Sequence, residues 1–234
     1  FFFTTCGWMM WNWLVSGLAS GATIVLYDGS PFHPDEGVLW RMTADEGVTI
    51  FGTSPKYLAA LDKSGYRPRD RLSLARLRTV LSTGSPLAPE QFDFVRDAVG
   101  GDVQLASISG GTDIVSCFAL GNPLLPVYRG ELQCRGLGMK VEVWDEDGRS
   151  VTGEKGELVC TAPFPSMPVG FWNDADGAKY RAAYFERFPG VWHHGDHAPL
   201  TERAALAILR RSDALPNPGG PRILESVAQA RSPV

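Results

Sequence analysis

Short apolar runs alternate with longer amphipathic segments along the first half of the chain. Four runs have the length of buried strands and are bounded by turn residues, at positions 22–27, 48–51, 77–81 and 103–106. Helices are predicted for the segments around them, at positions 8–20, 35–46, 56–63 and 89–99. Ser54 before Pro55 predicts a capped helix start, and Gly21 predicts a helix end. This alternation predicts a parallel α/β sheet with right-handed crossovers.

The pattern changes after Pro126. Residues 139–144 alternate between apolar and polar, Asp147-Gly148 marks a turn, and a second run follows at 156–160, which together predict a β-hairpin. A helix is predicted at 173–187 within this part. The predicted fold class is α/β, with a smaller β-barrel-like subdomain after the parallel one. The expected divisions are a parallel α/β subdomain at 1–126, a β-rich subdomain at 127–210, and a hinge with an irregular tail at 211–234.

Composition narrows the function classes. The 234 residues suffice for one large domain or two modest ones, and 44% hydrophobic and 21% charged residues are typical of a globular protein. A net charge of −4 argues against a nucleic-acid partner, and no apolar run is long enough to span a bilayer. Four widely spaced cysteines predict small buried residues in a reducing, cytoplasmic compartment. The start at Phe1, without Met or a signal-peptide layout, predicts a fragment.

Two small-residue loops follow predicted strands. Gly84-Ser85-Pro86 comes after the third strand and Ser109–Asp113 after the fourth. Parallel sheets bind ligands beyond the carboxyl ends of their strands, so a nucleotide-sized site is expected there. Thr112 offers a hydroxyl and Asp113 the hard oxygens that Mg²⁺ prefers. The alternative is that Ser109–Asp113 is an ordinary solvated loop.

Residues 192–197 (Trp-His-His-Gly-Asp-His) contain three of the four histidines. They partly match the H-x-H-x-D-H signature of binuclear zinc hydrolases, but Trp192 occupies the first histidine position. The other histidine is His33, so the imidazole ligands of such a site cannot be assembled. We therefore expect these histidines to pack and hydrogen-bond around a strand end.

The ordered series of Ser109–Asp113, His194-Gly195-Asp196 and Arg211-Ser212-Asp213 resembles the adenylate-forming acyl-CoA synthetase superfamily. The resemblance runs from Phe1 to about Ile223 and is greatest to the acetoacetate–CoA ligases within it. Further supporting segments lie at 6–13, 26–31, 82–87, 156–160, 171–174 and 217–220. It implies that ATP and Mg²⁺ activate a carboxylate as an acyl-adenylate, and that coenzyme A then displaces AMP to leave a thioester. The implied partners are the small molecules acetoacetate, ATP and coenzyme A.

The resemblance also implies a role for individual residues. Gly84, Ser85 and Pro86 would border the adenine. The implied catalytic residues are Thr112, at the α-phosphate, and Asp113, holding Mg²⁺ where the usual residue is Glu. Asp196 would accept hydrogen bonds from the ribose hydroxyls, Arg211 would assist at the ribose, and Asp213 matches the interdomain hinge. The structural alternatives are that Asp196 caps a turn and that Arg211 forms a surface ion pair.

Gly110 bears on the acyl substrate. In acetate-activating relatives a Trp at the matching position closes the acyl pocket, whereas Gly is expected to leave room for acetoacetate. Such a contact changes discrimination by about 1–3 kcal/mol per methylene. Trp8, Trp11 and Asn12 are expected to line the same pocket, although an aromatic helix face is also typical of a core.

The superfamily has two lysine-bearing elements that this sequence lacks. The resemblance implies a phosphate-binding loop before Phe1 and a catalytic Lys in a domain beyond Val234. Without their charges the phosphates are incompletely stabilised, so the chain is expected to be inactive without these N- and C-terminal portions. The alternative function is a non-catalytic AMP- or ATP-binding remnant, or a partner-binding module derived from such an enzyme.

Overall fold

The computed structural model describes residues 1–211 of the chain. It contains two compact units, one formed by Phe1–Ser107 and one that begins at Ile108. The subdomain limits at 1–126, 127–210 and 211–234 stay a prediction. Each unit is described by itself below.

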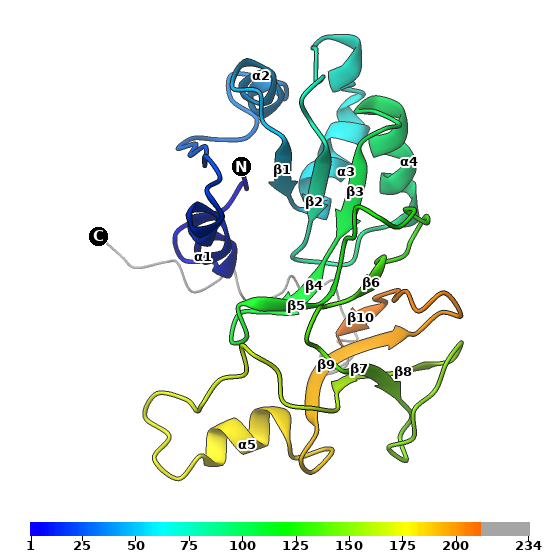
Figure 1. Ribbon diagram of the computed structural model, residues 1–234. Helices are drawn as coiled ribbons and strands as arrows, with labels where there is room; N and C mark the ends of the chain where they lie inside the picture. Colours follow the sequence, from blue (N-terminus) through cyan, green and yellow to red (C-terminus); the bar gives the residue numbers. More distant parts are fainter. Residues whose placement is uncertain (212–234) are drawn as a thin grey trace, which may run out of the picture. The chain divides into compact units, whose positions relative to one another are not determined.

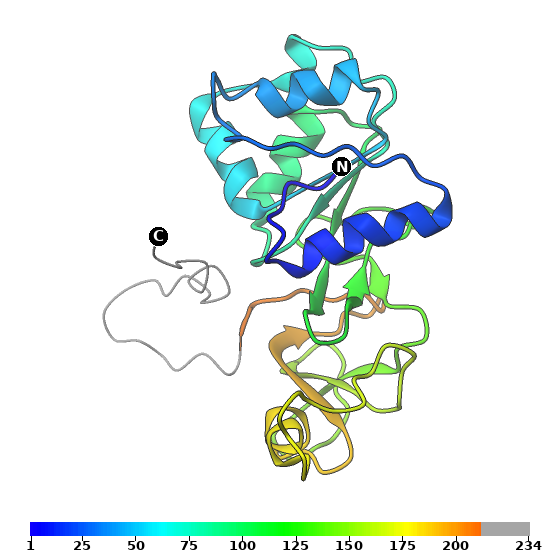
Figure 2. The ribbon, with the colours of Figure 1, turned by 90° about the vertical axis from the view of Figure 1, so that its left-hand side faces the viewer.

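The first unit contains the parallel sheet that the sequence predicts. Its strands are β1 (Ile50–Thr53), β2 (Thr79–Ser82) and β3 (Gln104–Ser107), in the order β1-β2-β3. Its helices are α1 (Met9–Ser16), α2 (Val38–Asp45), α3 (Pro55–Ser64) and α4 (Pro89–Ala98), with 3₁₀ turns at Gly17–Ser20 and Pro68–Asp70. Figures 1 and 2 show α3 and α4 together on one face of this sheet. The predicted α/β alternation is therefore confirmed.

The core of the first unit lies between the helices and the sheet. Trp40 of α2 stacks on Phe51 of β1, with ring centroids 4.5 Å apart, and both side chains are fully buried. Leu58 and Val95, from α3 and α4, join the same cluster. Burying side chains of this size stabilises the fold by about 1.5–3 kcal/mol each. The apolar stripes of the predicted helices thus form the face that covers the sheet.

The strand predicted at 22–27 is absent, and the prediction was wrong. The outer edge of β1 pairs instead with the N-terminal residues: Gly52 N donates to Phe1 O and Phe3 N donates to Gly52 O, both at 2.8 Å. Residues 22–27 therefore lack a strand partner, and Leu26 is left 57% exposed. Apolar content alone did not reveal that another segment takes this edge.

Strands β1 and β2 begin two residues later than predicted. Val48 N donates to Thr43 O, closing the end of α2, and Leu77 N donates to Leu74 O within a turn. The first residues of each apolar run are thus buried, but their hydrogen bonds belong to the preceding turn. The helix caps were predicted correctly: Ser54 Oγ accepts from Tyr57 N (3.4 Å), and Gly21 has a φ of +77°.

The second unit is antiparallel. One sheet has the order β4-β5-β6, and the other the order β10-β9-β8-β7. Their strands are β4 (Ser109–Gly111), β5 (Ser116–Leu120), β6 (Cys134–Arg135), β7 (Val141–Trp144), β8 (Lys155–Cys160), β9 (Trp192–Pro199) and β10 (Arg210–Arg211). The predicted hairpin is β7–β8, in which Val141 pairs with Cys160. The hydrophobic core of the second unit includes Phe118, Leu158 and Trp192.

The single helix described in the second unit, α5 (Ala178–Tyr184), is shorter than the predicted 173–187. The Asp174 carboxylate accepts from Lys179 N (3.0 Å) and Tyr180 N (2.9 Å), so it satisfies the first turn of the helix from outside. These bonds, that from Lys179 first, hold the pKa of Asp174 below its usual range. Figure 1 shows α5 beside the start of β9, which it contacts.

The cysteines differ in exposure, although all four were expected to be buried. Cys160 is buried and Cys117 and Cys134 are half-buried, but Cys6 is exposed, so the prediction was wrong for Cys6. All four are free thiols. Among residues 1–211, no helix is long and apolar enough to cross a membrane.

Candidate functional site

In the first unit, the loop after β2 holds the predicted adenine-contacting residues. Gly84 has a φ of +98°, a conformation that side chains disfavour, so the chain turns sharply at this point. The six-membered ring of Trp8 lies 3.5 Å from the position that a Cβ on Gly84 would take. Trp8, predicted for the acyl pocket, therefore lies against the loop predicted for adenine. Trp11 is half-buried and Asn12 is exposed on α1.

In the second unit, the predicted loop Ser109–Asp113 is partly a strand. Ser109–Gly111 form β4 and pair with β5, while Thr112 and Asp113 are exposed in the connecting turn. The turn closes through Val115 N, which donates to Thr112 O at 3.2 Å. The hairpin therefore leaves Thr112 and Asp113 exposed in its turn.

Gly110 is required by its own hairpin. A Cβ at this position would overlap the carbonyl oxygen of Ser116 and lie 2.8 Å from the Cα of Cys117, across a register shift in the β4–β5 pair. The sequence suggested that the missing side chain leaves room for an acyl group. Within this unit, however, a side chain here would meet the backbone of β5, so Gly110→Trp would first disrupt the hairpin.

Strand β9 holds β4 through two side chains. Ser109 Oγ donates to Asp196 Oδ2 at 2.8 Å, and Asp196 is only 5% exposed. His194 Nε2 lies 3.0 Å from Gly110 O, and because a carbonyl only accepts, this nitrogen carries the proton. Such polar partners offset the loss of hydration that a buried carboxylate suffers. The predicted ribose residue and the predicted phosphate motif are thus bonded to each other.

Asp113 has a partner that sequence analysis missed. Tyr184 Oη, at the end of α5, donates to Asp113 Oδ2. The Tyr184 ring stacks on Trp192, with centroids 3.6 Å apart and planes at 14°. No spacing rule links positions 113 and 184, so the sequence carried no local signal for this pair.

The other two histidines of residues 192–197 lie near Glu157 of β8, and His193 is the one that hydrogen-bonds to it. His193 Nε2 lies 2.9 Å from Glu157 Oε2, and Arg187 donates to Glu157 Oε1 at 3.0 Å. His197 Nδ1 is 3.8 Å from the same carboxylate. Thus His193 and His197 share one buried glutamate, whereas His194 bonds to β4.

Two groups near the hairpin have shifted pKa values. Burial raises the pKa of the Cys117 thiol, opposite Gly110, to about 11, so this thiol stays protonated at neutral pH. Burial, and secondarily the charge of Asp113, raise the pKa of Tyr180 on α5. Both groups are therefore neutral and act through hydrogen bonding or packing.

The second residue predicted for the ribose, Arg211, is located by the pairing of its backbone. Arg211 of β10 is directly opposite Asp196 in the β9–β10 ladder. This register brings two residues predicted for the same ligand group to neighbouring positions. Asp213, the predicted hinge, lies outside the described residues.

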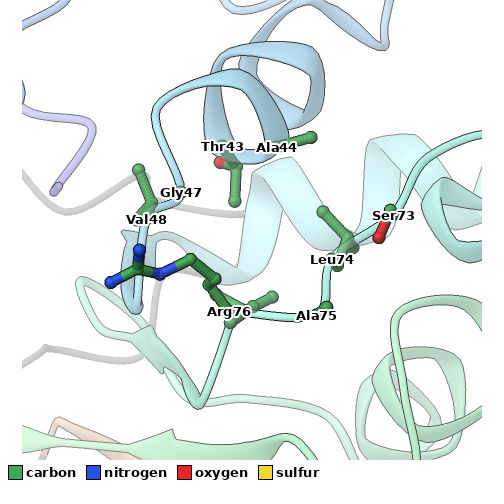
Figure 3. A pocket seen from close by; sticks show the side chains of 9 residues that line it. Thr43, Ala44, Gly47, Val48, Ser73, Leu74, Ala75 and Arg76 are labelled. Atoms are coloured by element: carbon green, nitrogen blue, oxygen red, sulfur yellow. The ribbon is translucent and has the colours of Figure 1, made fainter.

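The first unit contains a cavity of about 190 Å³ (Figure 3). It is lined at the end of α2 by Thr43, Ala44, Gly47 and Val48, and before β2 by residues 73–77. Both segments precede β1 and β2, so the cavity is at the amino ends of these strands. The Gly84 loop follows the carboxyl end of β2, which is where parallel sheets bind ligands.

Comparison with known proteins agrees with the resemblance in sequence. The family model "AMP-binding enzyme" matches residues 1–168. The acetoacetyl-coenzyme A synthetase of Rhizobium meliloti is 64% identical over 95% of this chain and 34% of its own length. A malonamoyl-CoA synthetase of Penicillium aethiopicum is 46% identical over 94% of this chain and 32% of its own length.

A solved structure gives the same result. The acetoacetyl-CoA synthetase from Streptomyces lividans superposes with a TM-score of 0.85 and is 51% identical, over 91% of this chain and 33% of that one. The chain therefore spans about a third of the length of the relatives it matches. On the match over residues 1–168 and these identities, the chain belongs to the AMP-binding enzyme family.

Proposed function

We propose that this chain is the part of an ATP-dependent acetoacetate–CoA ligase that contacts nucleotide, Mg²⁺ and acyl group. The observation that carries the proposal is the bond between Ser109 Oγ and Asp196 Oδ2, which joins the phosphate and ribose motifs. Acetoacetate is proposed from the 64% identical relative, whose name specifies that acyl group. Gly110 stays a proposed acyl-pocket residue, together with Trp8, Trp11 and Asn12, and its lack of a side chain is also required by the nearby backbone of β5.

The reaction assigns a task to each residue. An oxygen of the acetoacetate carboxylate attacks the α-phosphorus of ATP, a P–O bond forms, and the bond to pyrophosphate breaks. The sulfur of coenzyme A then attacks the acyl carbon, a C–S bond forms as the C–O bond to AMP breaks, and the thiol proton passes to solvent. Thr112 contacts the α-phosphate, Asp196 accepts from the ribose hydroxyls, with Arg211 assisting there, and Gly84 to Pro86 border the adenine.

The carboxylate of Asp113 suits a magnesium ion. It is exposed in its turn, and its one hydrogen bond within the described residues engages Oδ2 and leaves Oδ1 for a cation. A hard oxygen ligand of this kind usually binds Mg²⁺ together with substrate phosphates. Bound there, Mg²⁺ would offset the charge that develops on the phosphate oxygens.

Binding of AMP to the 234-residue chain tests the nucleotide site. Asp196→Asn keeps an oxygen that accepts from Ser109 but removes the charge, so AMP affinity should fall about 10- to 100-fold in isothermal titration. The matched control is Asp147→Asn, in an exposed turn of the same unit, which should leave affinity unchanged. Equal AMP affinity in wild type and Asp196→Asn, or no AMP binding by the folded chain, contradicts the proposal.

A pyrophosphate-release assay decides between ligase and non-catalytic binding module. With acetoacetate, ATP and Mg²⁺, we expect the chain to bind nucleotide without turnover and to gain activity when the remaining segments of a ligase are supplied. Malonamate serves as the competing acyl substrate, because one relative is named for it. Nucleotide binding with no activity in the completed enzyme favours the binding module instead.

A further inference from the structure

The side chain of Asp113 is held by a residue outside every motif in the sequence. We propose that Tyr184 is a positioning residue that orients the Asp113 carboxylate for Mg²⁺, an inference that rests on the proposed function. Its Oη donates to Asp113 Oδ2 from the last residue of α5. The donor thus reaches the exposed turn from a different element.

Tyr184 is itself fixed by packing. Its ring stacks on Trp192, which is 1% exposed and also packs edge-to-face against Phe164 and Phe185. The Tyr184 ring also makes edge-to-face contacts with Phe171 and Tyr180, so aromatic packing surrounds it from several directions. The hydroxyl is therefore held at a set position relative to β9, the strand that also carries Asp196.

The chemistry of the donor suits a metal ligand. A phenol is neutral, so it restricts the carboxylate without cancelling the charge that attracts a divalent cation. Lys or Arg would neutralise that charge, and within residues 1–211 neither forms an ion pair with Asp113. The bond also engages one oxygen only. Tyr184 thus restricts the rotation of Asp113 and leaves Oδ1 for coordination.

Tyr180 provides a matched control on the same helix. It lies one turn before Tyr184, and its ring also packs edge-to-face on Trp192 at 6.2 Å. Its hydroxyl, however, donates to Pro168 O at 2.8 Å. Tyr180→Phe and Tyr184→Phe therefore remove the same atom from the same helix, and only the second removes the bond to Asp113.

The test compares two affinities in the 234-residue chain by isothermal titration. AMP is measured without Mg²⁺, and ATP is measured over a series of Mg²⁺ concentrations. For Tyr184→Phe we expect unchanged AMP affinity and about 10-fold weaker Mg²⁺-dependent ATP binding. Tyr180→Phe should match wild type in both. A merely structural role would lower AMP affinity as well, because Trp192 and Asp196 share β9.

A double-mutant cycle completes the test. Asp113→Asn should weaken Mg²⁺-dependent ATP binding, and adding Tyr184→Phe to it should have no further effect, because the two residues act through one bond. Equal or stronger Mg²⁺ dependence in Tyr184→Phe, additive effects, or the same loss in Tyr180→Phe overturns the inference alone. A folded wild-type chain that binds neither AMP nor ATP overturns the proposed function and this inference with it.

Discussion

The two units place their candidate residues by different physical means. In the first unit, Gly84 to Pro86 come one residue after β2, so the parallel topology places them beyond the carboxyl end of that strand, where parallel sheets in general bind ligands. In the second unit, the Ser109–Asp113 hairpin is fixed by side chains remote in sequence. Its bonds to Asp196, His194 and Tyr184 join residues 87, 84 and 71 positions apart. The order of strands and helices positions Gly84 to Pro86, whereas hydrogen bonds from individual side chains position the Ser109–Asp113 hairpin.

Two glycines show the same difference between a local requirement and one set by a distant segment. Gly84 is needed for its own backbone angle, a local property of a sharp turn. Gly110 is needed because the backbone of β5 passes too close for a Cβ, a property of the partner strand. Sequence analysis could interpret the first as a turn glycine, but it assigned the second to an open pocket.

The largest effect is expected when the aromatic packing that holds Tyr184, a partner of the Ser109–Asp113 hairpin, is removed. Trp192→Ala deletes a fully buried ring on which Tyr184 stacks, and such deletions cost about 3–5 kcal/mol. Hydrogen exchange should report faster opening of the amides in β8 and β9. Trp172→Ala, whose ring is 91% exposed in the same unit, should change the free energy of unfolding by less than about 0.5 kcal/mol. A loss for Trp192→Ala as small as the one for Trp172→Ala would show that the Trp192 side chain gives no such support.

A smaller effect is expected from the hairpin itself. Gly110→Ala adds a Cβ where the Ser116 carbonyl stands, and forced displacement of packed groups costs about 1–3 kcal/mol. The matched control is Gly101→Ala, because a methyl group added at Gly101 would have no neighbour within 4 Å and the backbone there is not left-handed. Urea denaturation should show a loss for Gly110→Ala and none for Gly101→Ala. A neutral Gly110→Ala would restore the idea of open space at this position.

The sequence predicted the first unit better than the second, because local patterns determine more of the first unit. Helices and strands follow from local periodicity, and there the errors are two-residue shifts or, at 22–27, an unforeseen competitor for a sheet edge. The residues of the candidate site were identified through their motifs. Their mutual bonds were not, because Ser109–Asp196 and Asp113–Tyr184 depend on which strands meet across the chain. Local patterns carry no information about such pairings.

The smallest expected effect concerns Val115, which ends the turn that presents Asp113. Its φ of +44° is unfavourable for a β-branched residue, and its side chain is 51% exposed, so little packing offsets the strain. If bonds from β9 and α5 hold the turn, Val115→Gly should relieve the strain and raise the free energy of unfolding by about 1 kcal/mol. Val169→Gly, at a fully exposed valine without left-handed backbone, should instead lower it by about 0.5 kcal/mol. Thermal denaturation of both variants checks this sign difference. A loss in both would mean that Val115 itself stabilises the turn, and the contrast between local and remote positioning would then fail two residues after the proposed metal ligand.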